Sequence, residues 1–427
     1  MRGVGPGRGA RRRLLFIVIV AVACALPAWA AVGAAAQGAA AQGAASPTAA
    51  PALADSGSPL PSPTPTAVSA ALSKSTLTYG QSVTVSGAVD PAVEGQTVTV
   101  AVAGTTVKTA TTDVDGAYSV SFTPHYGGQV TASLADGTTS SPVSLVVKLR
   151  VTITGGKSVP WGRGRVVVQV RPVSYAGVVT AKIYHRGRCI ATLRRGVSDG
   201  RGVFSVRTPG VGRFTVYARA ATATGLSSPA AVHVAVNAPW HRLVVGSQGR
   251  YVKILLTRLA ALKFRVPSLS TTLSTAAGDS IVAFQKAYRL PRTYVFDGDD
   301  WRKLDGAKVV KVRHSLPATH IEIDKTRQIL MVVKGGKPLG IIPISSGATG
   351  NTPSGTFHIL WKAPSTTTWL GSAILWRTMD FYRNFAMHGY PEVPPYPASH
   401  GCVREPIWVA DWTYQRSWVG ETVYLYY

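Results

Sequence analysis

Near the end of the chain, a cysteine, two histidines and an arginine lie within a short stretch that could perform nucleophilic chemistry. Cys402 stands in the sequence Ser399-His400-Gly401-Cys402-Val403-Arg404, and His388-Gly389 lies upstream. A cysteine is a strong nucleophile as the thiolate, which nearby positive charge or a helix N-terminus stabilises. His388 and His400 are candidate general bases, and Arg404 adds a fixed positive charge. The stretch therefore predicts a cysteine nucleophile with a nearby general base.

The residues after Cys402 predict a helix. Pro406 favours the first helical position, and apolar residues recur at a helical spacing at Ile407, Ala410, Tyr414 and Trp418. We therefore expect Cys402 to lie near the positive end of this helix.

Three motifs in this part of the chain occur in an order that resembles the L,D-transpeptidases, the YkuD-like family. His388-Gly389 resembles the family's upstream His-Gly, and residues 399–404 resemble its Ser-His-Gly-Cys-x-Arg motif. Upstream, Asn351-Thr352-Pro353-Ser354-Gly355-Thr356-Phe357 is similar to the family's Thr-Pro-x-Gly-x-Phe loop. The resemblance covers roughly residues 317–427 and implies a β-rich catalytic domain there.

The resemblance implies a cysteine-dependent acyltransferase that acts on peptidoglycan. Cys402 would attack a tetrapeptide stem before its terminal D-alanine, with His388 as general base and the Gly389 carbonyl orienting that imidazole. Backbone amides around Gly401 and Cys402 would stabilise the oxyanion. The side-chain amine of a second stem would then resolve the thioester and give a 3→3 cross-link. The expected catalytic residues are Cys402, His388, His400 and Gly401, and the expected substrate-binding residues are Ser399, Arg404 and Gly389.

Three alternatives remain open at this point. Water could resolve the same thioester, which would make the protein an L,D-carboxypeptidase. The chain could also be a wall-anchoring or adhesion stalk without turnover, although such a protein would not need Cys402 and His388. A zinc site built from His388, His400, Cys402 and His358 lacks a recognisable short ligand pair. We expect no metal and no organic cofactor.

Composition points to several domains and a basic surface. The 427 residues exceed a single ordinary core, and the formal net charge is +26. A surface with this charge could bind nucleic acid, anionic lipid or anionic cell-wall polymers. No nucleic-acid motif occurs, so nucleic acid is not expected as a partner. Apart from Cys24, the cysteines Cys189 and Cys402 are expected to be free thiols, with Cys189 structural.

The N-terminal residues have the layout of a secretory signal peptide or an uncleaved signal anchor. Basic residues precede an apolar run from Leu14 to Leu26, and Ala28-Trp29-Ala30 offers a cleavage site. Removing residues 1–30 deletes five arginines and no acidic residue, which lowers the charge from +26 to +21. A disordered Ala/Pro/Ser/Thr linker is expected at 31–69. These features predict a secreted, extracytoplasmic protein of the cell wall, attached to a membrane only if the N-terminal segment is not cleaved.

Two segments with period-two patterns follow the linker and predict two β-sandwiches. The first, at 70–147, resembles bacterial immunoglobulin-like repeats around Tyr79-Gly80-Gln81 and Asp115-Gly116-Ala117. The second, at 148–237, repeats the same rhythm. Neither segment carries a catalytic motif, so both are expected to act as spacers.

The pattern then changes to that of helices, and later returns to strands. Val252, Leu255 and Leu259 lie on one helical face, as in a small helical module. Residues 238–306 resemble the three-helix peptidoglycan-binding-like domain through Gly246-Ser247-Gln248-Gly249, Ala283-Phe284-Gln285-Lys286-Ala287 and Phe296-Asp297-Gly298. The module could bind glycan or only pack against the catalytic domain. From 317 to 427, strands are expected to build one mostly antiparallel sheet with the nucleophile at its edge. The predicted fold class is thus multi-domain and mainly β, with two β-sandwiches, a small three-helix module and a C-terminal β-rich L,D-transpeptidase fold.

Overall fold

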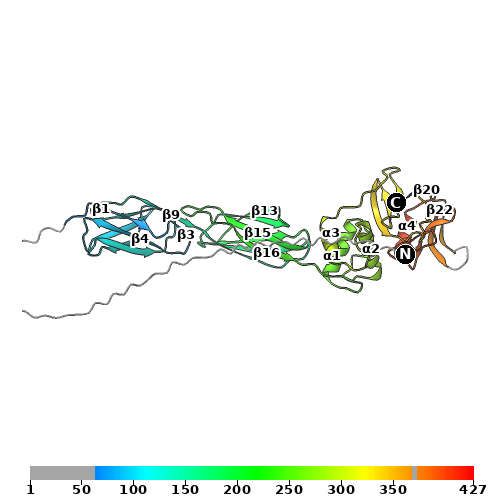
Figure 1. Cartoon of the computed structure of the whole chain (residues 1–427), viewed down its shortest axis with the longest axis horizontal. Coiled ribbons are helices and arrows are strands. Elements are labelled where there is room, and N and C mark those ends of the chain that lie inside the picture. The colour runs from blue at the N-terminus through cyan, green and yellow to red at the C-terminus, as the bar shows by residue number, and fades with distance from the viewer. Residues whose placement is uncertain (1–62, 368–372) are drawn as a thin grey trace, which may run out of the picture. The chain divides into compact units, whose positions relative to one another are not determined.

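The computed structural model describes residues 63–367 and 373–427, and within them it is mainly β with four helices (Figure 1). This agrees with the predicted fold class. The predictions for the signal segment 1–30, which includes Cys24, and for most of the linker fall outside the described residues. None of the helices in the described ranges has the length and hydropathy that a membrane span requires.

The first sandwich consists of two sheets. One has the order β1-β4-β2, with β7 also paired to β4, and its strands are Ala67–Val68, Val83–Asp90, Ala71–Leu72 and Ala117–Phe122. The other has the order β3-β9-β8-β5-β6, and its strands are Thr76–Thr78, Val143–Lys148, Gly128–Ser133, Thr97–Val102 and Thr105–Thr111. Ala67 and Val68 pair with β4, which places these two residues in the sandwich although they belong to the segment expected as linker.

The second sandwich is also built from two sheets. The order β10-β11-β14 joins Arg150–Gly155, Arg163–Arg171 and Arg201–Arg207. The order β13-β12-β15-β16 joins Arg188–Gly196, Val178–His185, Gly212–Ala220 and Val232–Ala238. Side chains alternate strictly: Phe214, Val216 and Ala218 of β15 are buried, whereas Arg213 and Tyr217 face solvent. The valine repeats of the sequence therefore form the interior, and the basic residues lie outside.

Three helices follow: α1 (Arg250–Ala261), α2 (Thr275–Ala287) and α3 (Gly298–Gly306). Ser274 begins α2 by accepting a hydrogen bond from the Ala277 amide at 3.2 Å. Asp297 and Asp300 form a capping box at the start of α3. Both caps satisfy amides that a helix start leaves unpaired, which explains why the helices begin where they do.

The C-terminal domain contains two sheets and one helix. The first sheet has the order β19-β18-β17-β25-β20, and its strands are Lys337–Pro343, Ile329–Lys334, His320–Asp324, Thr422–Tyr426 and Gly355–His358. The second has the order β21-β22-β23-β24, and its strands are Trp361–Thr367, Ile374–Tyr382, Phe385–Tyr390 and Val403–Pro406. Helix α4 spans Ile407–Gln415.

The expectation of a single sheet in this domain is wrong. Most pairs are antiparallel, but β17 pairs with β25 in parallel, and so does β23 with β24. Parallel pairing requires a long connection, and the chain between Tyr390 and Val403 supplies it. This connection carries the residues around Cys402.

The β18 strand is buried on both faces, which explains its continuous apolar sequence. Ile329, Met331 and Val333 pack into one core with the three helices, whereas Leu330 and Val332 pack into the core of the C-terminal domain. The helical module therefore completes the core of the C-terminal domain. The turn from β18 to β19 is Gly335-Gly336, and both residues have positive φ, as a two-residue hairpin turn requires.

Candidate active site

The structure brings the two motifs onto neighbouring strands. In the parallel pair of β23 and β24, His388 lies opposite Arg404, and Met387 lies opposite Val403. Cys402 immediately precedes Val403, in the bend that leads into β24, and its thiol is hydrogen-bonded to the backbone of Ala386, two residues before His388 on β23. β24 is the last strand of its sheet, so the cysteine lies at a sheet edge, as the sequence predicted.

His388 is a buried imidazole with a fixed orientation. Its side chain is buried, and its Nδ1 lies 3.1 Å from the carbonyl oxygen of Gly389. Because a carbonyl oxygen only accepts, Nδ1 carries the proton and Nε2 is left to accept one. Burial, above all, lowers the pKa of His388 to about 4; the bond to Gly389 raises this pKa, and Arg404 lowers it. The imidazole is therefore uncharged near neutral pH.

Cys402 is a protonated thiol at rest. Its Sγ lies 3.7 Å from the carbonyl oxygen of Asn384. Burial raises the pKa of Cys402, a hydrogen bond from the Ala386 backbone lowers this pKa, Asp380 raises it, and Arg404 lowers it. The thiol consequently needs a base to remove its proton.

The helix expected to stabilise the Cys402 thiolate does not reach it. Helix α4 begins at Ile407, as the proline predicted, but Pro406 is the N-cap and β24 lies between it and the cysteine. Four extended residues span about 13 Å, and a helix dipole acts mainly within its first turn. The prediction of a helix-stabilised thiolate is therefore wrong.

Side chains from two loops hold the backbone around Cys402. The Ser399 hydroxyl accepts from the Gly401 amide at 3.0 Å and donates to the Cys402 carbonyl at 2.5 Å. Thr352 Oγ1 donates to the Gly401 carbonyl at 2.7 Å, and Asn351 Nδ2 donates to the His400 carbonyl at 2.6 Å. These bonds fix the turn before the nucleophile.

A side chain at Gly401 would strain this arrangement. Its φ is +142°, and an added Cβ would lie 2.6 Å from the Phe385 ring. Its amide is bonded to Ser399, and within the described residues the Cys402 amide makes no hydrogen bond. At this turn the Cys402 amide, rather than that of Gly401, is therefore the one left free to donate a hydrogen bond.

Arg404 and His400 lie at the periphery of the site. The Arg404 guanidinium stacks over the Tyr390 ring at 4.3 Å, and the same ring meets His388 edge-on with centroids 5.8 Å apart. The His400 side chain is exposed, and its contribution to the turn is its backbone carbonyl. Arg404 is thus held beside the base.

Sequence reasoning assigned no role to Asp380, Asn351 or Thr352. Asp380 is buried on β22; its Oδ2 has no partner within the described residues, and burial raises its pKa. An aspartate between Met379 and Phe381 in an apolar strand was the signal for it in the sequence. Asn351 and Thr352 stood in the recognised loop, but only the fold shows that they contact the turn at Gly401.

Two other sequence expectations can be compared with the described residues. Cys189 and Cys402 are both free thiols, as predicted, although Cys189 is exposed on β13 and packs in no core. His388, His400, His358 and Cys402 form no group of three ligands that could hold a metal, and no other such group occurs in the described part of the chain. The geometry therefore gives the zinc alternative no support.

Comparison with known proteins identifies the domain that holds this site. Residues 318–425 match the model of the L,D-transpeptidase catalytic domain, YkuD. The chain is 30% identical to an L,D-transpeptidase structure from Xylanimonas cellulosilytica, with 44% of this chain and 98% of that chain covered and a TM-score of 0.42. The chain belongs to the L,D-transpeptidase family.

Other solved L,D-transpeptidases share less sequence with this family member. A structure from Stackebrandtia nassauensis is 22% identical, with 43% of this chain and 95% of that chain covered and a TM-score of 0.30. One from Mycobacterium smegmatis is 12% identical, with 66% of this chain and 99% of that chain covered and a TM-score of 0.24. No curated protein matches the chain.

Proposed function

We propose that this L,D-transpeptidase family member forms 3→3 cross-links between peptidoglycan stems through a thioester on Cys402. The observation that carries the proposal is the neutral His388, fixed by the Gly389 carbonyl on the strand next to the nucleophile. A neutral base beside a neutral thiol can take the thiol proton when a substrate carbonyl is in place.

In the first half-reaction, Cys402 Sγ attacks the carbonyl between the diamino acid and the terminal D-alanine while its proton passes to His388 Nε2. The Cys402 amide stabilises the resulting oxyanion. The imidazolium then protonates the leaving D-alanine nitrogen, the C–N bond breaks, and a thioester remains.

In the second half-reaction, the side-chain amine of an acceptor stem attacks the thioester. His388 accepts a proton from this amine, the C–S bond breaks, and the Cys402 sulfur recovers a proton from the imidazolium. The products are a cross-linked dimer and free enzyme. Water in place of the amine would give a tripeptide, which is the carboxypeptidase outcome.

Placement at the wall belongs to the same proposal. The basic N-terminal residues followed by an apolar run support export, with residues 1–30 as a cleaved signal or an uncleaved anchor. The two sandwiches would act as spacers, and the helical module would contact the wall as well as completing the core beneath β18.

The test uses one disaccharide-tetrapeptide and analyses the products by mass. The unaltered protein is expected to release D-alanine and form dimer, and Cys402→Ala is expected to do neither. Cys189→Ala is the matched control, because it removes the other thiol from an exposed strand and should leave the products unchanged. D-alanine release by Cys402→Ala would overturn the proposal, and tripeptide without dimer would favour hydrolysis.

A further inference from the structure

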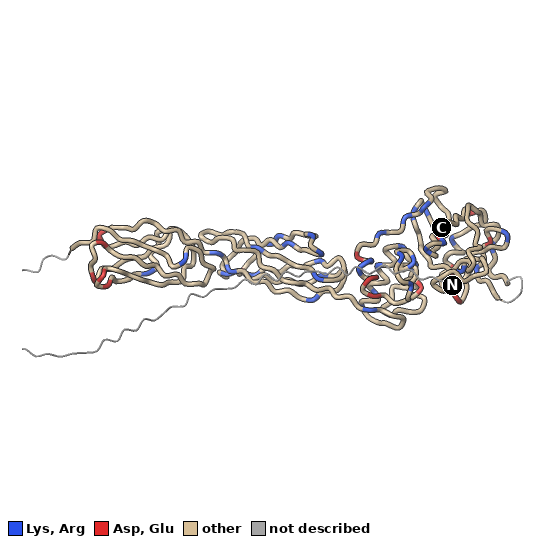
Figure 2. Tube along the Cα trace, in the orientation of Figure 1, with Lys and Arg blue, Asp and Glu red and all other residues tan. Residues whose placement is uncertain are grey.

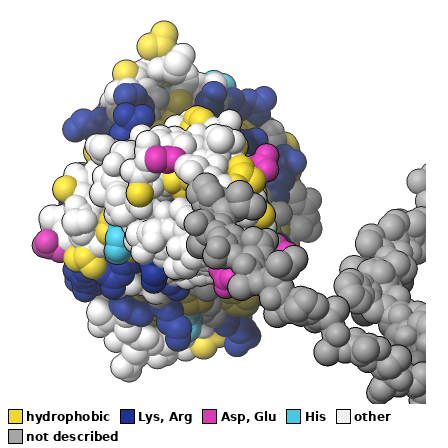
Figure 3. Space-filling model, turned by 90° about the vertical axis from the view of Figure 1, so that its left-hand side faces the viewer, with side chains coloured by type: hydrophobic (Ala, Val, Ile, Leu, Met, Phe, Trp, Pro, Cys, Tyr) yellow, Lys and Arg dark blue, Asp and Glu magenta, His cyan; other side chains and the backbone are white. Residues whose placement is uncertain are grey.

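The positive charge of the chain is concentrated in the second sandwich. Residues 148–237 contain fifteen Lys and Arg and one acidic residue, Asp199, whereas residues 70–147 contain two Lys and five acidic residues. Figure 2 shows this contrast along the chain. In Figure 3, which looks onto the end of the first sandwich, acidic side chains occur singly. Like charges this dense repel one another, so the concentration indicates a polyanionic partner.

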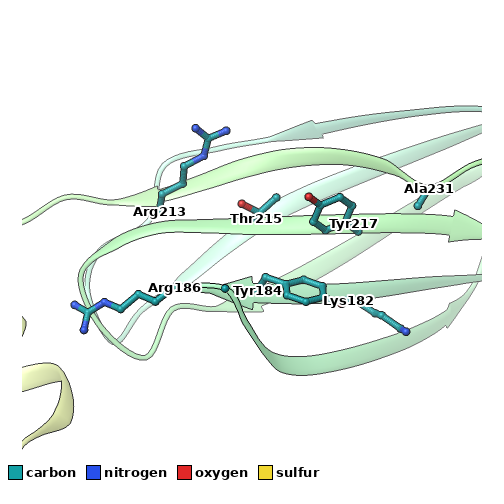
Figure 4. Close-up of a pocket in the computed structure, with 8 residues that line it drawn as sticks. Lys182, Tyr184, Arg186, Arg213, Thr215, Tyr217 and Ala231 are labelled. Carbon is teal, nitrogen blue, oxygen red and sulfur yellow. The ribbon is translucent and has the colours of Figure 1, made fainter. Parts of the chain in front are cut away.

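One groove on the second sandwich combines this charge with aromatic rings. It has a volume of about 640 Å³ and lies on the outer face of the sheet that contains β12 and β15. In the register of these strands, Lys182 lies opposite Tyr217, and Tyr184 lies opposite Thr215. Figure 4 shows the two tyrosines along the groove, with Arg213 beyond one end and Lys182 near the other. We call it the Tyr184–Tyr217 groove.

The tyrosines belong to an aromatic cluster that faces solvent. The rings of Tyr184 and Tyr217 meet edge-on at 5.5 Å, and Tyr217 lies 5.2 Å from His233 of β16. Tyr217 is 40% exposed, and within the described residues neither tyrosine hydroxyl has a hydrogen-bond partner. The cluster therefore offers apolar ring faces and free hydroxyl groups, which suit a ligand that is itself a ring bearing hydroxyls.

The cations of the groove are available to a ligand. Lys182 and Arg213 form no ion pair with any acidic residue that the structure describes, and both are exposed. Arg186 differs, because it is paired with Asp305 at 2.8 Å. Lysine and arginine bind carboxylates through charge-assisted hydrogen bonds, and they stand here on either side of the tyrosines.

We propose that the Tyr184–Tyr217 groove binds an anionic polysaccharide of the cell wall. Its sugar rings would lie against Tyr184 and Tyr217, and carboxylates on those rings would bind Lys182 and Arg213. The choice of a wall polymer rests on the extracytoplasmic placement proposed above. The groove is a separate site from Cys402 and uses none of its residues, so its ligand would hold the enzyme at the wall without entering the reaction.

The test measures binding of the purified protein to four polymers at fixed ionic strength: polygalacturonate, dextran, inorganic polyphosphate and single-stranded DNA. Polygalacturonate carries both rings and carboxylates, dextran carries rings without charge, and inorganic polyphosphate carries charge without rings. We expect polygalacturonate to bind most tightly. Lys182→Gln combined with Arg213→Gln should weaken its binding about tenfold, since charge-assisted bonds are lost. Tyr217→Leu should weaken polygalacturonate binding and leave polyphosphate binding unchanged.

A matched pair of substitutions distinguishes binding at the Tyr184–Tyr217 groove from non-specific attraction by the other positive charges of the sandwich. Arg163→Gln with Arg165→Gln removes the same charge from β11, which is in the other sheet of the sandwich. This pair should leave polygalacturonate binding nearly intact. The proposal would be overturned if both pairs of substitutions weakened polygalacturonate binding equally. It would also be overturned if polyphosphate bound as tightly as polygalacturonate. Tighter binding of single-stranded DNA would overturn it in favour of a nucleic-acid site.

Two further measurements keep the result interpretable. Thermal unfolding shows whether each variant is folded, and Tyr217→Phe, which retains the ring, should bind nearly as well as the unaltered protein. D-alanine release from a soluble tetrapeptide should be the same for all groove variants. If that release is absent from every protein, including the unaltered one, the transpeptidase proposal fails while the binding result still stands.

Discussion

At the scale of single residues, the site is a neutral pair rather than an ion pair. The sequence suggested a thiolate held by positive charge, whereas burial acts oppositely on the two groups: it raises the pKa of Cys402 and lowers that of His388. Both shifts favour the uncharged forms. Asp380 adds to the effect on Cys402, because its negative charge disfavours a second one nearby.

The first prediction concerns the pH dependence of acylation. His388 must be unprotonated to accept the thiol proton, and its pKa is lowered to about 4. The rate of covalent modification by a carbapenem should therefore stay high as pH falls through 6.5, and drop only near pH 4. The measurement is the intact mass of the adduct over time from pH 3.5 to 8. Circular dichroism at each pH shows whether the protein is still folded.

A midpoint near 6.5 would contradict this prediction, because it would mean that burial does not perturb His388. Cys402→Ala serves as the control and should gain no mass at any pH. If Cys402→Ala gains the same mass as the unaltered protein, the carbapenem modifies a residue other than Cys402.

The residues of the site were predictable from the sequence, but their charges were not. Cys402, His388, Gly389 and Ser399 stand in contiguous motifs, so residue type and order are enough to find them. Burial and the partners of a turn depend on segments distant in sequence, such as Asn351 and Asp380. No local pattern contains that information, which is why the free amide of Cys402 and the neutral pair emerge only from the structure.

At the scale of elements, the helical module is part of the support of the site. Lys286 of α2 is fully buried and donates to the Ile344 carbonyl at 2.6 Å, and Trp408 of α4 donates to Asp279 at 2.9 Å. Periodicity predicted the strands and helices because each has one regular pattern. It could not predict that β18 is covered by helices on one face, or that the C-terminal strands divide into two sheets, because both depend on long-range pairing.

The second prediction concerns Arg292, which joins the module to the connection before Ser399. Its Nη1 donates to the Pro395 carbonyl at 2.7 Å, and its Nη2 lies 3.4 Å from the carbonyls of Thr326 and Arg327. Arg292→Gln should loosen the segment that leads to the nucleophile and lower kcat/KM for D-alanine release about three- to tenfold. Product release is followed with a soluble tetrapeptide.

Arg289 provides the matched control for this experiment. It is exposed just after α2, and its side chain makes no hydrogen bond with any described residue, so Arg289→Gln removes the same charge without touching the connection. Equal losses in the two variants would mean that charge, rather than the clamp on Pro395, causes the effect.

At the scale of the whole molecule, catalysis and charge reside in different parts of the chain. The site belongs to residues 318–425, whereas the densest positive charge belongs to 148–237. The valines of the second sandwich fill its core, and its basic side chains lie outside that core, all of them exposed except the half-buried Lys148. A surface of this kind attracts anionic partners but does not stabilise the fold, because its like charges repel one another.

The third prediction follows from this distribution. Association of the purified protein with isolated peptidoglycan sacculi should weaken as salt rises from 0.05 to 0.5 M, because the screening length shortens from above 10 Å to only a few Å. The bound fraction is measured by sedimentation of sacculi at each salt concentration. Cys402→Ala should bind like the unaltered protein, since attraction by charge does not involve the nucleophile. Binding that is insensitive to salt would instead assign attachment to uncharged glycan contacts, with the helical module as the first segment to test.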